Sequence, residues 1–189
     1  MNYLVFDIET TEAVGPGEIT DLNISVVSVY TSQNKEIQSF TVDEFGKMWE
    51  LFENADAIIG YNSEHFDIPI LNKYYPGDLS QIKSIDILKS IKESFGRRVK
   101  LDDVANATLG KKKIANGLQA IEWWKEGKID EIKKYCEEDV MITKDIFEYA
   151  LNYKRLHLLN FGGEKIDIKI DTNGWDEKES SSITFSMGF

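Results

Sequence analysis

Two carboxylates follow the first apolar segment of the chain. The run YLVF, beginning at Tyr3, has the composition of a strand that is buried on both faces, yet it leads directly into Asp7 and Glu9. Residues two apart on a strand point to the same side, so both carboxylates project together from the strand's carboxyl end. Like charges this close repel unless protons or a cation neutralise them. The pair is therefore a candidate metal site, although a solvated turn after a strand produces the same D-x-E pattern.

Two further segments place polar side chains beside apolar ones. In DAIIGYNSEHFDIPIL, an apolar strand precedes Asn62, and Asp67 falls in the first turn of the next helix, where the helix dipole favours an anion. In IKKYCEEDVMITKDIF, Tyr135 and Asp139 stand four residues apart and share one helical face. Each feature taken singly has a plainer explanation, as a helix-start aspartate, a loop asparagine, or a half-exposed tyrosine beside a solvated aspartate.

The elements that must position these side chains form an alternating pattern. The predicted strands are 3–8, 23–31, 35–41, 57–61 and 84–86. The predicted helices run from a cap at Asp43 to about Asn54, from about Phe66, and over most of the later chain to about Tyr153. A meander of strands followed by strands and helices in turn predicts an α/β fold, with a mixed β-sheet flanked by helices.

The last part of the chain has a different character. Gly162-Gly163 lie between two runs of alternating hydrophobicity, which predicts a β-hairpin over 157–171. The sequence beyond it is polar with scattered aromatic residues. We therefore expect one domain at 1–155, a hairpin extension packed on that domain at 156–174, and a loosely held polar tail at 175–189.

Composition narrows the class of protein. A chain of 189 residues with 42% hydrophobic residues is long enough for one well-cored domain. The single cysteine, Cys136, cannot form an intramolecular disulfide, which fits a reducing compartment. The sequence shows neither a basic stretch followed by an apolar leader nor an apolar run of roughly 18 residues. We expect a cytoplasmic protein without membrane contact.

The charge is unevenly distributed. The chain has 33 acidic and 22 basic residues, a net charge of −11, which by itself argues against a polyanionic partner. Residues 89–113 are an exception, because eight basic residues outnumber three acidic ones there, a local charge of +5. Such a run is either a solvated face, as charge runs usually are, or part of a groove that follows phosphates.

The order of the three carboxylate segments carries more information than any one of them. D-x-E after an N-terminal strand, N-x-x-x-F-D about sixty residues later and Y-x-x-x-D on a late helix resemble the three motifs of the DEDD (DnaQ-like, RNase H-like) exonucleases, in the tyrosine-containing DEDDy branch. The resemblance covers about residues 1–155 and is greatest to the freestanding bacterial-type enzymes related to polymerase proofreading domains. It implies an RNase H-like fold and metal-dependent 3′-to-5′ removal of nucleotides, with single-stranded DNA favoured over RNA.

The resemblance also implies a role for each motif residue. It makes Asp7, Glu9, Asp67 and Asp139 the metal ligands and Tyr135 the group that orients the attacking water. Asp7 would bridge two ions, with Glu9 and Asp139 on the ion nearer the water. Oxygen-only ligands suit Mg²⁺ or Mn²⁺ far better than Zn²⁺. We therefore expect two such ions as cofactors.

Substrate contacts are expected from residues around the motifs. These are Thr10, Thr11, Asn62, Lys111, Lys112 and Lys113. Glu12 stands where related sequences commonly have glycine, which leaves the shape of that loop open. The expected partner is a nucleic acid with a free 3′ end, with a helicase or polymerase as a further partner. Two alternatives stay open, namely an RNase H-like endonuclease and a nucleic-acid-binding scaffold subunit of a helicase or polymerase complex.

Overall fold

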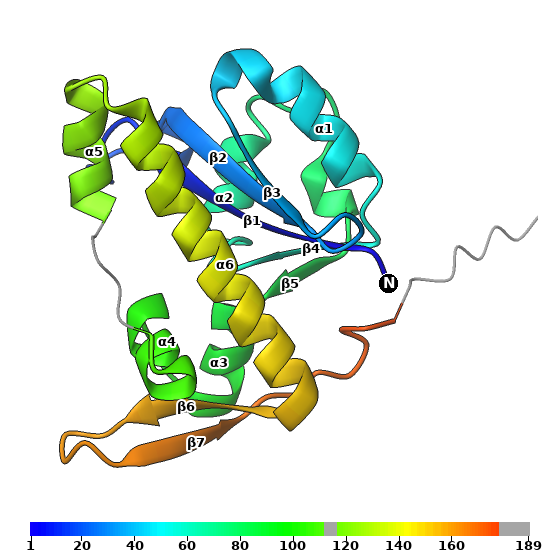
Figure 1. Cartoon of the computed structure of the whole chain (residues 1–189), viewed down its shortest axis with the longest axis vertical. Coiled ribbons are helices and arrows are strands. Elements are labelled where there is room, and N and C mark those ends of the chain that lie inside the picture. The colour runs from blue at the N-terminus through cyan, green and yellow to red at the C-terminus, as the bar shows by residue number, and fades with distance from the viewer. Residues whose placement is uncertain (112–116, 178–189) are drawn as a thin grey trace, which may run out of the picture.

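A five-stranded mixed sheet forms the centre of the molecule (Figure 1). The computed structural model describes residues 1–111 and 117–177. The strands are β1 (Tyr3–Thr10), β2 (Ile24–Thr31), β3 (Glu36–Phe40), β4 (Ala57–Gly60) and β5 (Ser84–Asp86), in the sheet order β3-β2-β1-β4-β5. β1 pairs antiparallel with β2 and parallel with β4, and β5 is parallel to β4. The carboxyl ends of β1, β4 and β5 therefore meet at one edge of the sheet, and the predicted α/β fold with a mixed sheet is confirmed.

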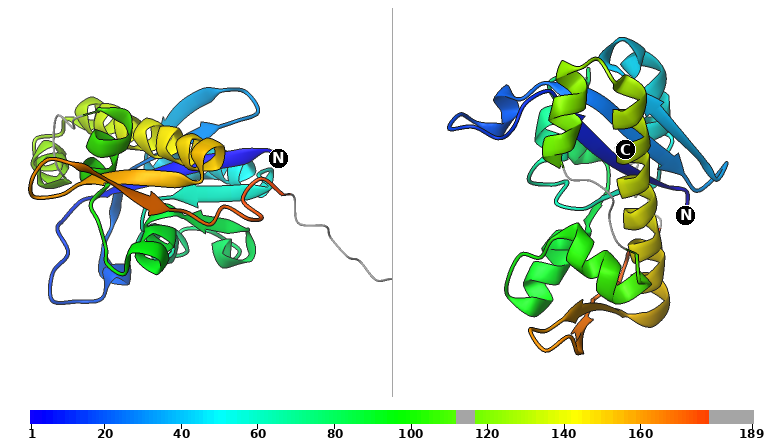
Figure 2. Two further views of the ribbon diagram at one scale, coloured as in Figure 1. Left: turned by 90° about the horizontal axis from the view of Figure 1, so that it is seen from below. Right: turned by 60° about the vertical axis from the view of Figure 1, so that its left-hand side comes forward.

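Six α-helices lie in the described residues. They are α1 (Phe45–Glu53), α2 (Asp67–Leu71), α3 (Ile87–Phe95), α4 (Leu101–Leu109), α5 (Gly117–Lys125) and α6 (Ile129–Tyr153), with short 3-10 helices at Ile19–Asp21, Val42–Glu44 and Leu79–Gln81. Figure 2 shows α5 beside the first half of α6, with α3 and α4 grouped at the other end of the molecule. Among these helices, none combines the length and apolarity needed to cross a membrane.

The sheet divides the core into two clusters. Leu4, Phe6 and Ile8 of β1 pack against α1 and α2 on one face. Val5 faces the opposite way and packs with Val140 of α6 and with residues of α3 and α4. This alternation follows from the two-residue period of a strand. The face of β1 that carries Val5 is therefore the face that packs against α6.

The start of α1 differs from the sequence prediction. Asp43 lies within a 3-10 helix, and α1 begins two residues later, at Phe45. Thr41 precedes the 3-10 helix, where its backbone N–H donates to a Glu44 carboxylate oxygen at 3.0 Å and its carbonyl accepts from the Glu44 N–H at 2.8 Å. These reciprocal bonds cap the 3-10 helix at Thr41, two residues before the predicted cap at Asp43.

The predicted hairpin is present as β6 (Arg155–Leu159) and β7 (Lys165–Lys169), which pair antiparallel. Its apolar residues belong to the same buried cluster as α4 and α6. The chain beyond the hairpin departs from prediction, because Trp175 is buried and stacks on Phe147 of α6 with ring centroids 5.5 Å apart. The expectation of a loose tail beginning at residue 175 is therefore wrong at Trp175, whose ring covers apolar surface of α6. Residues 178–189 of that tail lie outside the described residues.

Candidate functional site

The two carboxylates of β1 face α6. Because Val5 packs toward α6, strand alternation directs Asp7 and Glu9 to the same side. One carboxylate oxygen of each residue and the Cys136 sulfur of α6 all lie within 4.8 Å of one another. Glu9 is buried, and Asp7 is partly exposed. The strand and the helix together form one acidic cluster.

A β-bulge sets the end of β1. The pairing of β1 with β2 shifts register between Glu9 and Thr10, so Ser25 becomes the extra residue on β2. The buried Ser25 hydroxyl donates to the Glu9 carbonyl at 3.0 Å. Bulges re-aim side chains where a ladder ends. This one orients the chain around Glu9 as the strand leaves the sheet.

α6 contributes Tyr135, Cys136 and Asp139, all buried. The Cys136 thiol lies 3.3 Å from the Asp7 carbonyl oxygen and 3.8 Å from Asp7 Oδ2. Burial, together with the charges of Asp7 and Glu9, raises the pKa of this thiol well above its ordinary value. In the metal-free protein the thiol is therefore neutral and acts as a hydrogen-bond donor to Asp7.

Cys136 was not predicted from the sequence to be part of the site. As the single cysteine of the chain, it served there only to exclude an intramolecular disulfide. Its position directly after Tyr135, three residues before Asp139, is the signal that places it beside the same helical face. Contact with Asp7, however, depends on how α6 crosses β1.

Tyr135 is held between the carboxylates and α5. Its ring makes an edge-to-face contact with Trp123, with centroids 6.2 Å apart. Burial, and then the charges of Asp139, Glu9 and Asp7, raise the pKa of the phenol above its ordinary value. The hydroxyl therefore stays protonated at neutral pH, where it can donate or accept a hydrogen bond but not serve as a strong base.

Asp67 approaches β1 from the other side, at the start of α2. It is 3% exposed, and a backbone N–H bond from Ile8 reaches its carboxyl group. β4 ends at Gly60, where a side chain would collide with Ser63. β4 pairs with β1 only as far as Val5, and the turn after β4 brings α2 to the part of β1 that β4 leaves unpaired. The Ile8 contact places Asp67 beside the backbone between Asp7 and Glu9.

The pKa of Asp67 shifts in the direction opposite to the one that the helix dipole favours. Burial, with a smaller contribution from the charge of Asp86, raises the pKa of the Asp67 carboxyl from 3.8 to about 7. The N–H groups of Asp67 and Ile8 act in the opposite direction but are outweighed. The expected helix-dipole preference for the anion is therefore not decisive, because α2 has only five residues and the carboxyl is almost fully withdrawn from water.

The chemistry of these donors fits a divalent cation. Glu9, Asp67 and Asp139 are buried carboxyl groups, and buried like charges are unfavourable without compensation. Carboxylate oxygens are the donors that Mg²⁺ and Mn²⁺ prefer. Asp7, Glu9 and Asp139 therefore form a candidate centre for divalent metal, with Asp67 at the adjacent edge of β1.

The expected substrate residues have mixed surroundings. Thr10 and Thr11 follow Glu9 directly, but the Thr11 N–H donates to the Asn23 carbonyl at 2.9 Å and is not available to a ligand. The Thr10 hydroxyl donates to the Glu12 carbonyl at 2.7 Å. Among the described residues, positive φ outside glycine occurs at three positions that do not include Glu12, so this loop does not require a glycine there.

The remaining expected contacts in the described residues have partners within the protein. Asn62, with φ of 72°, accepts a hydrogen bond from the Arg98 guanidinium. Lys111 forms an ion pair with Asp145 of α6 at 2.6 Å. Lys112 and Lys113 lie outside the described residues. The structure thus brings the motif residues of β1 and α6 together, sets Asp67 at the edge of β1, and gives two of the basic or polar candidates protein partners of their own.

The sheet order, the helix across it and the acidic cluster at one edge define an RNase H-like architecture. The family model of the RNase H superfamily matches residues 4–151. The chain therefore belongs to the RNase H superfamily. This membership and the acidic cluster support a nuclease that uses divalent metal.

A solved structure agrees with this assignment at the level of the fold. The chain is similar to the family B DNA polymerase from the hyperthermophilic archaeon Pyrobaculum calidifontis, with a TM-score of 0.62 and 22% identity over 79% of this chain. It spans 24% of the length of that polymerase. A comparison with curated proteins gave no match.

Proposed function

We propose that this protein is a 3′-to-5′ exonuclease that hydrolyses phosphodiester bonds at the 3′ end of a nucleic acid, with single-stranded DNA as its favoured substrate. The observation that carries the proposal is the convergence of Asp7 and Glu9 of β1 with Tyr135 and Asp139 of α6. The side chains of Asp7 and Glu9 lie close to the Cys136 sulfur of α6. The charges of Asp139, Glu9 and Asp7 all act on the Tyr135 phenol and raise its pKa. These residues come from two of the three sequence motifs, and Asp67 comes from the third.

The carboxylates of this cluster are the proposed holders of two Mg²⁺ or Mn²⁺ ions. Such ions, when bound, lower the pKa of water and stabilise charge on the attacking and leaving oxygens. Asp7, Glu9 and Asp139 present oxygen donors from the α6 face of β1, and Asp67 presents its own from the strand edge. Holding these donors in place before a substrate arrives is the work of β1, its bulge and α6.

Tyr135 is proposed to orient the water that attacks the phosphate. Its hydroxyl is protonated at neutral pH, so its contribution is a hydrogen bond of fixed direction and not removal of a proton. Trp123 supports the ring from α5 and limits its rotation. The Cys136 thiol bonds to the Asp7 backbone and holds this part of β1 against α6.

The substrate contacts belong to the same proposal. Thr10 and Thr11 are proposed to contact the terminal nucleotide, chiefly through their hydroxyl groups, since the Thr11 N–H is already bonded. Lys111 can turn from Asp145 to a phosphate, because its side chain is 47% exposed. A helicase or polymerase partner accords with the likeness to a polymerase of which this chain spans about a quarter.

The deciding experiment compares strand ends. A single strand labelled at its 5′ end should be shortened progressively in Mn²⁺ or Mg²⁺, and a circular strand of the same sequence should stay intact. Asp7→Asn and Asp139→Asn should abolish the shortening, which excludes a contaminating nuclease. Cutting of the circle would instead assign an RNase H-like endonuclease, and binding without any cleavage would assign a scaffold protein.

A further inference from the structure

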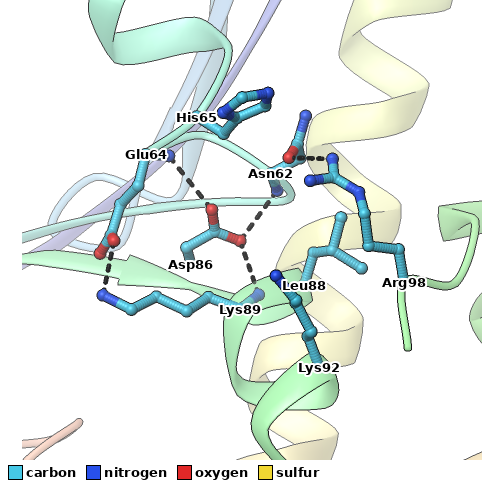
Figure 3. A pocket seen from close by; sticks show the side chains of 8 residues that line it. All are labelled: Asn62, Glu64, His65, Asp86, Leu88, Lys89, Lys92 and Arg98. Atoms are coloured by element: carbon cyan, nitrogen blue, oxygen red, sulfur yellow. Dashed lines mark hydrogen bonds and ion pairs between the residues drawn. The ribbon is translucent and has the colours of Figure 1, made fainter. Parts of the chain in front are cut away.

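A pocket at the ends of β4 and β5 lies beside the carboxylate site. It has a volume of about 280 Å³ (Figure 3). Its lining residues are Asn62, Glu64, His65, Asp86, Leu88, Lys89, Lys92 and Arg98. Because β1, β4 and β5 are parallel neighbours, their carboxyl ends share one edge of the sheet. The pocket and the acidic cluster therefore open along the same edge.

Asp86 builds the floor of this pocket. Its buried carboxylate accepts backbone N–H bonds from Asn62 at 2.9 Å, Glu64 at 3.1 Å and Lys89 at 3.2 Å. Figure 3 shows these bonds converging on the one side chain. They tie the turn after β4 to the start of α3, so the negative charge of Asp86 is already compensated by the protein.

The side walls carry an excess of positive charge. Glu64 and Lys89 neutralise each other in an ion pair of 2.7 Å. Arg98 donates to the neutral amide oxygen of Asn62, and Figure 3 shows Lys92 extending from α3 into the same pocket. Within residues 1–111 and 117–177, neither Arg98 nor Lys92 has an ion-pair partner. Two exposed cations thus face the pocket without a carboxylate of their own.

The Asn62 backbone shows that the position of Arg98 is imposed. Asn62 has φ of 72°, a left-handed conformation that costs free energy in a residue other than glycine. In this conformation its N–H reaches Asp86 while its side chain reaches Arg98. The turn therefore offers the guanidinium a hydrogen-bond acceptor at the wall of the pocket, and leaves its other N–H groups for a ligand with several acceptor oxygens.

We propose that Arg98 and Lys92, with Arg98 held by Asn62, form a subsite for an internal phosphate of the bound strand. The proposal rests on the proposed nuclease function, because the strand is its ligand. Two strand spacings separate β1 from β5, about 10 Å. Successive phosphates of a strand lie at least the roughly 3.4 Å rise of B-form DNA apart, and farther apart when the strand is extended, so this distance spans at most about three linkages. The phosphate should therefore lie within about three linkages of the one nearest the 3′ end.

The test is a binding experiment with single neutral linkages. A short single strand carries one methylphosphonate in place of a phosphate, at each of the first five linkages from the 3′ end in turn. Binding is measured by fluorescence anisotropy with a chelator present, so no strand is cut. The wild type should lose roughly tenfold in affinity at one linkage, the size of one charge-assisted hydrogen bond. A free mononucleotide as the true ligand would produce no such position.

Two arginine variants distinguish a contact from a general effect of charge. Arg98→Gln should bind the unmodified strand roughly tenfold more weakly and lose little more at the sensitive linkage. Its affinity should also depend less steeply on salt, by about 0.7 in the logarithmic slope. Arg97→Gln is the matched control, because Arg97 lies over the Phe95 ring and does not line the pocket. It should keep the linkage effect, and thermal melting should show both variants folded.

The outcomes separate this subsite from the proposed activity. Equal behaviour of Arg98→Gln and Arg97→Gln, or a linkage effect that persists unchanged in Arg98→Gln, would overturn the subsite. If Arg98→Gln fails to fold, Lys92→Gln carries the same test, since Lys92 is exposed on α3. A protein that shows the linkage effect but cuts no strand would refute the proposed function and leave the subsite. Cleavage from 3′ ends without the linkage effect would refute the subsite and leave the proposed function.

Discussion

In the metal-free protein, the stability of Asp67→Asn relative to the wild type should increase as the pH rises through neutrality. The pKa of Asp67 is raised from 3.8 to about 7 in the folded protein, mainly by burial. The folded state therefore holds this proton more tightly than the unfolded chain does. The stabilisation that results is fully present below about pH 3.8 and is lost as the pH rises through about 7.

The size of the effect follows from the shift. At about 1.4 kcal/mol per pKa unit, the whole loss is about 4 kcal/mol, and the part that falls between about pH 5 and 8 is roughly 2–3 kcal/mol. Asparagine is neutral throughout, so Asp67→Asn escapes this loss. For a chain of this length, its melting temperature should gain on wild type by roughly 5–10 °C over the same interval.

The assay is unfolding by urea or heat at several pH values in a chelator. The amide also changes the hydrogen bond with Ile8, which shifts the free energy of unfolding by a constant amount. The diagnostic quantity is therefore the pH dependence of the difference in free energy of unfolding between Asp67→Asn and the wild type. Asp43→Asn, at an exposed position, is the control and should track wild type. In saturating Mn²⁺ the order should reverse, since the charged carboxylate binds a cation more strongly than the neutral amide does and so stabilises the native state more. Parallel pH curves for Asp67→Asn and wild type in chelator would refute the raised pKa and the burial that causes it.

Three further results are expected from the site and the core. Mn²⁺ should raise the melting temperature of the wild type and much less that of Asp7→Asn, and equal shifts would exclude a shared metal site. Tyr135→Phe should slow cleavage roughly a hundredfold or less while keeping Mn²⁺ stabilisation and strand binding, whereas Asp139→Asn should impair metal binding as well. A wild-type cleavage rate for Tyr135→Phe, measured when chemistry limits turnover, would show that the tyrosine has only a structural role. Trp175→Ala should lower the free energy of unfolding by about 3 kcal/mol, measured by urea denaturation, and truncation after Asn173 should do the same because it removes the same buried ring. An undiminished stability would place Trp175 outside the core.

Local periodicity explains why much of the site was predictable. A strand period of two places Asp7 and Glu9 on one face, and a helix period near four places Tyr135 and Asp139 on one face. Both statements hold for any fold that contains the strand and the helix. The positions of the five strands and of the hairpin, to within about two residues, and the end of α6 at Tyr153 followed from the same kind of local signal.

What local periodicity leaves open is the environment of each side chain. A sequence shows that Asp67 begins a helix, but its protonation depends on burial against β1 and on the nearby charge of Asp86. Likewise, Arg98 belongs to a basic run, and only the left-handed turn at Asn62 gives its guanidinium a fixed position. Desolvation and charge–charge effects depend on distances between segments far apart in the chain, which no local pattern specifies.

The sequence by itself determined which groups are available for chemistry and on which faces of their own elements they lie. The tertiary structure decided which faces meet. The crossing of α6 over β1 makes Cys136 a hydrogen-bond donor to Asp7, and the packing of the chain after β7 buries Trp175 against α6. Both contacts join residues from distant parts of the chain. They form because burying apolar surface on both sides of one sheet fixes how its helices must lie, and the polar groups of the site are carried into place with them.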